Sequence, residues 1–287
     1  MIRSVFTLLK ESFSVFQAAN AISRGAAIAF YAVTSIVPVL LIVIAVAGSL
    51  FGQEAARGAI FGQFRGLLGA EGAEFLQKAI LSASDRPAGL VASLIGIGTL
   101  IVAASGVFVE VEDALNAIWE VKPRSEGLSR FVRARIASLG LVLALGFLLM
   151  VSLVVDAGLE ALSGLIDAYL PFGTALLMGA SFIVSFALNA LLFAAMYKIL
   201  PDTLLPWRNV IFGAVVTAFL FEIGKKLIGI YLGSSSAASS LGAAGALLGL
   251  LFWVYYSAQI FLFGAALTKT YSSGARAAQS QSIANTA

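Results

Sequence analysis

The sequence contains no cysteine and no histidine, and only 11% of its 287 residues are charged. The missing cysteines exclude disulfides and thiolate chemistry, and the missing histidines exclude imidazole-based proton transfer. Together the two absences exclude the usual zinc sites, so we expect no metal, no cofactor and no enzymatic activity. A soluble globular protein is about 25% charged. The shortage of charge therefore indicates a membrane protein.

Apolar residues are abundant: they make up 60% of the chain, and the mean hydropathy is +0.98. Six apolar runs are long enough to cross a hydrocarbon core of about 30 Å, which takes about 20 helical residues. They cover residues 26–50, 89–109, 136–155, 172–197, 210–232 and 242–267. Membrane strands would be about 10 residues long and would alternate in polarity. The runs therefore predict an all-α polytopic membrane protein with six transmembrane helices.

The predicted membrane domain covers residues 25–270 and includes an external loop, residues 51–88, and a further segment flanks the domain at each end. In residues 1–24, Val5, Phe6, Leu9, Phe13 and Phe16 share one helical face, which predicts an amphipathic helix on the cytoplasmic membrane surface rather than a cleaved signal peptide. Residues 51–88 form an external loop whose periodicity predicts two short amphipathic helices. Residues 271–287 are small and polar, and we expect a disordered cytoplasmic tail.

The distribution of Lys and Arg between the loops predicts the orientation. The loop after the second run contains five basic residues: Lys122, Arg124, Arg130, Arg133 and Arg135. The loop after the third run contains Asp156, Glu160 and Asp167 and no basic residue. Basic loops face the cytoplasm. Both termini should therefore be cytoplasmic, as an even number of spans requires.

The fifth run carries three charges, Glu222, Lys225 and Lys226. Glu222 would lie about 18 Å into the membrane core, counting 1.5 Å per residue from Val210. Spacings of three and four residues place the three charges on one helical face. A charge at this depth costs about 2.5–3.5 kcal/mol. Two interpretations stay open: a polar pathway or headgroup site inside the bundle, or lysines that reach the outer interface while Glu222 pairs with one of them.

Other polar or conformationally special residues lie inside the runs. Pro38 removes a backbone hydrogen bond and predicts a bend in the first helix. The hydroxyls of Tyr31, Thr34 and Ser35 lie one turn or less before it and can satisfy freed carbonyls. Asn189 and Gln259 are single amides inside the fourth and sixth runs. We expect each of them to form an interhelical hydrogen bond.

An acidic cluster follows the second run at the predicted inner membrane edge: Glu110, Glu112 and Asp113. It is either a proton or cation relay or, as we favour, a helix entering the cytoplasm with its acids paired to arginines of the next loop. Gly245 and Gly249 in the sixth run have the four-residue spacing of close helix packing. That packing can occur within one chain or between chains.

Four stretches carry a resemblance to a known family: AAIAFYAVTSIVPVLLIVIAVAG, ALNAIWEVKPR, LPDTLLPWRNVIFGAVVTAFLFEIGKKLIGIYL and LGAAGALLGLLFWVYYSAQIFLFGAALTKTY. In this order they resemble the BrkB/YihY family of bacterial inner-membrane proteins. The resemblance implies six membrane helices with cytoplasmic termini, envelope- and virulence-associated roles, and a suspected part in lipid or small-molecule transport. The family's older ribonuclease label is disfavoured here, because the chain lacks histidine and a basic groove with interleaved aromatic residues.

Our leading hypothesis is a transporter or flippase-like protein for an envelope lipid or an amphipathic anionic solute. It would have no ATPase of its own, because the chain lacks a phosphate-binding loop. The pathway candidates are Glu222, Lys225, Lys226, Tyr31, Ser35, Pro38, Asn189 and Gln259. The alternative is a non-transporting scaffold for envelope assembly. The expected partners are membrane lipids and either other envelope proteins or a second copy held through the sixth helix, but no nucleic acid.

Overall fold

The computed structural model describes residues 5–84, 106–122, 173–234 and 242–284. Within these ranges the chain is helical and contains no strand, which confirms the all-α prediction. The predicted third span, 136–155, and most of the second, 89–109, lie outside the described ranges. The number of six membrane helices therefore stays a prediction.

Four of the predicted runs are helices in the structure, and each helix contains most or all of its run. They are α2 (Ala21–Phe51), α6 (Gly173–Ile199), α7 (Trp207–Ser234) and α9 (Gly242–Ala284). The other described helices are α1 (Val5–Ala18), α3 (Gln53–Ser84) and a helix over residues 106–119. The helices extend past the apolar runs because backbone hydrogen bonding does not stop where the side chains become polar.

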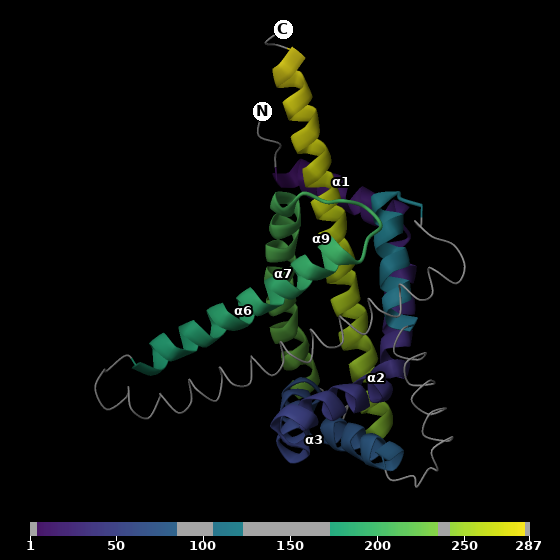
Figure 1. Ribbon diagram of the computed structural model, residues 1–287, viewed down its shortest axis with the longest axis vertical. Helices are drawn as coiled ribbons and strands as arrows, with labels where there is room; N and C mark the ends of the chain where they lie inside the picture. Colours follow the sequence, from purple (N-terminus) through teal and green to yellow (C-terminus); the bar gives the residue numbers. More distant parts are fainter. Residues whose placement is uncertain (1–4, 85–105, 123–172, 235–241, 285–287) are drawn as a thin grey trace.

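Two stretches of the described chain are long and apolar enough to cross a membrane, Phe182–Ile199 and Leu247–Gly274. A third appears if α1 and Ala21–Val37 count as one span, although the two are bent by 64°. Asn20 lies at this bend with a left-handed φ of 52°, a conformation that asparagine tolerates better than most residues. The bend places α1 across one end of the bundle (Figure 1).

The central helix of the described fold is α9 (Figure 1). It packs against α1, α2, α3 and α7, while α6 packs against α7. In Figure 1, α1 crosses α9 near one end of the bundle, and α3 lies at the other end. The same view shows α6 crossing α7 obliquely. The side of α7 on which Glu222 is buried is therefore set by how α7 packs against its neighbours.

Glycine and threonine interlock where α7 meets α9. A Cβ atom on Gly213 would lie 1.7 Å from Oγ1 of Thr268, and one on Gly264 would lie 1.8 Å from Oγ1 of Thr217. Each threonine hydroxyl donates to the carbonyl of the glycine one turn earlier on its own helix, at 2.7 Å. Because Gly213 faces Thr268 and Thr217 faces Gly264, the helices are antiparallel. The glycines leave no room for another register.

The side chain of Tyr197 joins α6 to this interface. It is fully buried, and its hydroxyl donates to the Phe261 carbonyl at 2.6 Å and lies 2.9 Å from Oγ1 of Thr217. Its ring stacks on that of Phe261, with centroids 4.9 Å apart. A buried hydroxyl needs such partners, because an unsatisfied one costs about 1–3 kcal/mol. Tyr197 therefore fixes the end of α6 against both other helices.

The segment predicted as two short helices is one assigned helix, α3, Gln53–Ser84. A straight helix of this length would extend about 48 Å, but α3 folds back on itself at the end of the bundle (Figure 1). Ile60, Leu76 and Ile80 from its two halves join one apolar cluster with Leu40 and Ile44 of α2. Burial of these side chains against α2 explains why the segment stays with the bundle.

The structure agrees with the helix predicted at the N-terminal end and differs from the disorder predicted at the C-terminal end. The predicted N-terminal helix is confirmed as α1, with Phe16 buried and Val5, Phe6 and Phe13 exposed; its place on a membrane surface stays a prediction. At the other end, α9 continues as helix to Ala284, where the sequence predicted disorder from residue 271. The segment has no proline and several alanines, which favour helix.

Candidate functional site

The carboxylate of Glu222 is buried between α6 and α7, with 7% of the residue exposed. The side-chain amide of Asn189 on α6 donates to its Oε1 at 3.0 Å. The ammonium of Lys225, one turn further along α7, lies 2.9 Å from Oε2 and 3.0 Å from Oε1. Both carboxylate oxygens therefore have partners. We call these three residues the Glu222 group.

The rotation of α7 explains why Glu222 is inside. Every fourth residue along one side of the helix is a large exposed apolar residue: Ile211, Val215, Phe219, Ile223 and Leu227. The opposite side carries the residues that face α6 and α9, among them Gly213, Thr217 and Ala218. Glu222 continues the buried side, one turn after Ala218. Glu222 is thus turned into the protein and pairs with Lys225, as the second interpretation expects of this carboxylate, while a polar pathway or headgroup site here stays a prediction.

The two lysines, which the sequence placed on one face with Glu222, have different environments. The side chain of Lys225 is 38% exposed and pairs with Glu222, while Lys226 is exposed. Adjacent helical residues point about 100° apart, so one lysine reaches the carboxylate and the next turns away. Lys226 therefore does not belong to the Glu222 group.

Aromatic rings pack together where α6, α7 and α9 meet, and one of them, Phe221, is next to Glu222 in the sequence. The rings of Phe193 on α6 and Phe221 on α7 meet edge to face with centroids 5.6 Å apart, and Phe221 lies 5.4 Å from the ring of Trp253 on α9. Glu222 itself is buried, and in a buried site each hydrogen bond to a charged group is stronger than in water, and a lost partner costs more.

The predicted residues of the first helix lie on α2, away from the contacts of the Glu222 group. The hydroxyl of buried Ser35 donates to the Tyr31 carbonyl at 2.6 Å, and the Tyr31 ring is partly exposed beside Phe30. Pro38 lies inside α2 and leaves the carbonyl of Thr34 without its helical donor. The expectation that the hydroxyls serve this carbonyl is wrong for Ser35 and Thr34, which donate to the carbonyls of residues 30–32.

Gln259 ties α9 to the beginning of α2. Its Nε2 donates to the Ile22 carbonyl at 3.2 Å, and a Cβ on Gly25 would lie 2.1 Å from that nitrogen. Both predicted amides thus form contacts between helices, which confirms that expectation. Only Asn189 joins the Glu222 group.

The acidic cluster lies on the helix of residues 106–119. Burial raises the pKa of Glu110, an effect opposed by the charge of Arg24 and increased by Asp113. The arginines expected to pair with the cluster, Arg130 and its neighbours, lie outside the described residues. Within the described part of the chain, no group of three carboxylates is arranged to hold a metal ion.

Gly245 and Gly249 are both buried within the chain, whereas Leu247 and Leu248 between them are exposed. The glycine pair therefore serves packing inside the protein. Self-association through the sixth helix stays a prediction, but this pair is not available for it.

Side-chain contacts that the sequence did not predict gather at the end where α1 crosses α9. They are Asn116–Asp202 (2.9 and 3.3 Å), Lys269–Glu120 (3.0 Å) and Asn209–Ser272 (2.9 Å). They join the helix of residues 106–119, the α6–α7 loop and the beginning of α7 to their neighbours. Burial of Asn116 and Asn209 was the available signal, since buried amides need partners. Sequence spacing cannot name a partner 86 residues away.

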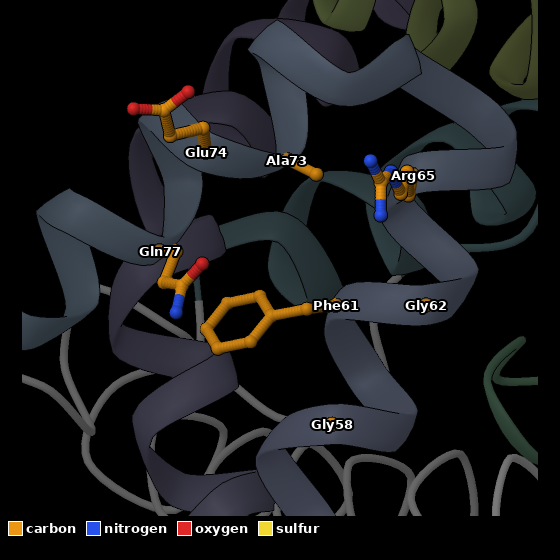
Figure 2. A pocket seen from close by; sticks show the side chains of 7 residues that line it. All are labelled: Gly58, Phe61, Gly62, Arg65, Ala73, Glu74 and Gln77. Carbon is orange, nitrogen blue, oxygen red and sulfur yellow. The ribbon is translucent and has the colours of Figure 1, made fainter.

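A cavity of about 400 Å³ lies elsewhere, between the two halves of α3 (Figure 2). None of its lining residues belongs to the Glu222 group. The buried charge and the cavity are therefore two separate features of the molecule.

The comparisons with known proteins agree on one family. A family model described as Virulence factor BrkB matches residues 12–286. A UPF0761 membrane protein of Ralstonia nicotianae is 30% identical over 244 residues, and the match covers 84% of this chain and 53% of the relative. One of Azotobacter vinelandii is 30% identical over 252 residues, covering 86% and 58%. One of Mannheimia succiniciproducens is 29% identical over 277 residues, covering 93% and 92%.

No solved structure matches the chain. The chain spans a little over half the length of the first two relatives, 53% and 58%, and nearly all of the third. The family match includes α2, α3, α6, α7 and the whole of α9, and so both the Glu222 group and the α3 cavity. By this match and the resemblance in its sequence, the chain belongs to the BrkB family of membrane proteins.

Proposed function

We propose that the protein moves an anionic amphipathic molecule, an envelope lipid or a related solute, across the bacterial inner membrane. The observation that carries the proposal is the Glu222 group: a buried carboxylate in an apolar helix, held by Asn189 and by a partly exposed ammonium. Ionisable groups inside membrane helices are costly and mark transport pathways more often than not. The family description as a virulence factor is in keeping with a role at the envelope.

Lys225 is the residue that would hold the substrate. Its side chain is 38% exposed, so an anion can approach the ammonium from outside the α6–α7 contact. A phosphate or carboxylate would accept a charge-assisted hydrogen bond from it. Glu222 then competes with the substrate for Lys225, which keeps the bound state weak enough to be released.

Asn189 provides the link between this exchange and the shape of the bundle. Its amide bridges α6 to Glu222 on α7. When a substrate anion binds the Lys225 ammonium, the Glu222 carboxylate keeps only its hydrogen bond from Asn189 of α6. A change of partners at one carboxylate thus alters what holds α6 to α7, and α6 is the helix that crosses obliquely (Figure 1).

The test uses the full chain reconstituted in liposomes, with fluorescent phosphatidylglycerol as the anionic probe and phosphatidylcholine as the zwitterionic one. Lys225→Ala should lower the rate of phosphatidylglycerol movement about tenfold, because a hydrogen bond to a charged group is worth about 1.5–3 kcal/mol. Lys226→Ala is the matched control, since it removes the same charge one residue away. Soluble anions are tested for flux in the same vesicles.

The alternative is a scaffold, and one observation favours it: the Glu222 group satisfies its own hydrogen bonds, as a purely structural contact would. A scaffold predicts that no variant changes probe movement and that Asn189→Leu only lowers the melting temperature. If wild type, Lys225→Ala and Lys226→Ala move every probe equally and faster than protein-free liposomes do, the assignment of Lys225 as the substrate-binding residue is wrong. If none of them moves any probe faster than protein-free liposomes do, the transport proposal is wrong.

A further inference from the structure

The cavity in α3 has one wall from each half of that helix. Its lining residues are Gly58, Phe61, Gly62, Arg65, Ala73, Glu74 and Gln77. Figure 2 shows the Arg65 guanidinium directed toward Ala73 and the Phe61 ring directed toward Gln77, across the gap between the walls. The Glu74 carboxylate points away from this gap.

The charge presented to the cavity is positive. The Glu74 carboxylate forms an ion pair with Lys78 at 2.6 Å, so its charge is already balanced. Arg65 is exposed, and no ion pair of its guanidinium is present among the described residues. A guanidinium offers planar paired donors that match phosphate and carboxylate oxygens. The Gln77 amide adds a donor on the opposite wall.

The glycines of the first wall are not explained by packing. A Cβ on Gly58 or on Gly62 would meet no atom within 4 Å. Glycine inside a helix is less favourable than alanine, so an alanine at either position would serve the helix better. What the two glycines provide is open space and an accessible backbone on the side of the cavity that also carries Arg65.

We propose that this cavity binds the phosphate group of an amphipathic molecule. The phosphate lies against the Arg65 guanidinium and the Gln77 amide, and the adjoining carbon atoms lie on the Phe61 ring beside the two glycines. The site shares no residue with the Glu222 group and does not depend on the transport proposal. The same phosphate chemistry is offered by a lipid headgroup and by a soluble phosphate ester.

The experiment measures binding to the purified full chain with one probe for each source. Glycerol 3-phosphate is titrated into the protein in detergent by calorimetry, and phosphatidylglycerol adducts are counted by native mass spectrometry in nanodiscs, against phosphatidylcholine. Wild type should bind at least one phosphate probe saturably. Arg65→Gln should weaken that binding at least tenfold, whereas Arg208→Gln, which removes an exposed charge at the start of α7, should bind like wild type.

Gly62→Leu separates binding from folding. Leucine is a good helix former, and its side chain would enter the open space, so the variant should melt at or above the wild-type temperature and lose the probe. Binding of glycerol 3-phosphate assigns a soluble ester, and binding of phosphatidylglycerol alone assigns a lipid; both support the site. The proposal is overturned if neither probe binds, if Arg208→Gln loses as much affinity as Arg65→Gln, or if folded Gly62→Leu binds like wild type.

Discussion

Glycine has opposite roles in two regions of this protein. At the α7–α9 interface, a Cβ on Gly213 or Gly264 would lie within 2 Å of a threonine hydroxyl of the facing helix. On α3, a Cβ on Gly58 or Gly62 would meet nothing within 4 Å. All four glycines cost the helix about 0.5–1 kcal/mol relative to alanine. In the first region this cost is offset by close packing, and in the second it leaves a cavity.

The difference shows that the spacing of glycines does not reveal their purpose. Gly58 and Gly62 are four residues apart, as are Gly245 and Gly249, yet the first pair faces open space and the second is buried. Close helix packing is the common use of that spacing in membrane proteins. Whether a helix or a void lies opposite depends on how the chain folds back.

The largest effect is expected at the interlocked interface. Gly213→Ala places a methyl group where Thr268 now stands, so either the side chain or the helix must move. Overpacking of this kind typically costs about 1–3 kcal/mol, which should lower the melting temperature in detergent by several degrees. Gly213→Ala combined with Thr268→Ala should recover part of the loss, because the hydroxyl at 1.7 Å is gone. An unchanged melting temperature in the single variant would show that the interface is not tight.

A smaller loss is expected for Tyr197→Phe. The variant keeps the stacked ring but removes the hydroxyl that contacts the Phe261 carbonyl and Thr217. Thr217 keeps its bond to the Gly213 carbonyl, so no donor is left unpaired and the cost should be about 1 kcal/mol. Thermal unfolding measures it. A loss as large as that of Gly213→Ala would mean that the hydroxyl, and not the glycine contact, holds the interface together.

On α3, replacing glycine by alanine should raise the stability of the fold instead of lowering it. Gly62→Ala adds a methyl group in open space, so the variant should be more stable than wild type by about 0.5–1 kcal/mol. Gly58→Ala should behave in the same way, and the pair should be close to additive, because neither methyl group meets another side chain. The measurement is the same unfolding experiment. A loss of stability in either single variant would show that the wall is packed against something and would remove the contrast between the two regions.

The smallest effect is expected at the rim of the cavity. Hydrogen bonding and charge from Lys78 lower the pKa of Glu74, so the pair stabilises the fold above the ordinary carboxyl pKa and loses this contribution as the pH falls through the lowered value. Both side chains are largely exposed, and such surface pairs contribute little. Lys78→Gln should therefore leave the melting temperature at neutral pH within experimental error. A clear decrease would mean that this exposed pair contributes more to stability than surface ion pairs usually do.

Several features of the fold were predictable from local patterns. Apolar length located the helices α2, α6, α7 and α9, although within the described residues only Phe182–Ile199 and Leu247–Gly274 are by themselves long and apolar enough to cross a membrane. The amphipathic face of α1 followed from residue spacing in the same way. The extent of α9 to Ala284 was not predicted. Small and polar residues from 271 onward predict disorder, although the alanines and glutamines among them still favour helix.

For the candidate site, the sequence alone determined that Glu222 stands in an apolar helix and that a charge there needs a partner. It also placed one lysine at each of the two spacings that can reach that carboxylate. Only the tertiary structure decided that the Lys225 ammonium pairs with the carboxylate, that the Asn189 amide of α6 donates a hydrogen bond to it, and that Lys226 is left exposed. The physical reason is the rotation of α7 about its own axis. Helical spacing relates residues within α7, but the side of α7 that meets α6 is set by the glycine–threonine contacts with α9.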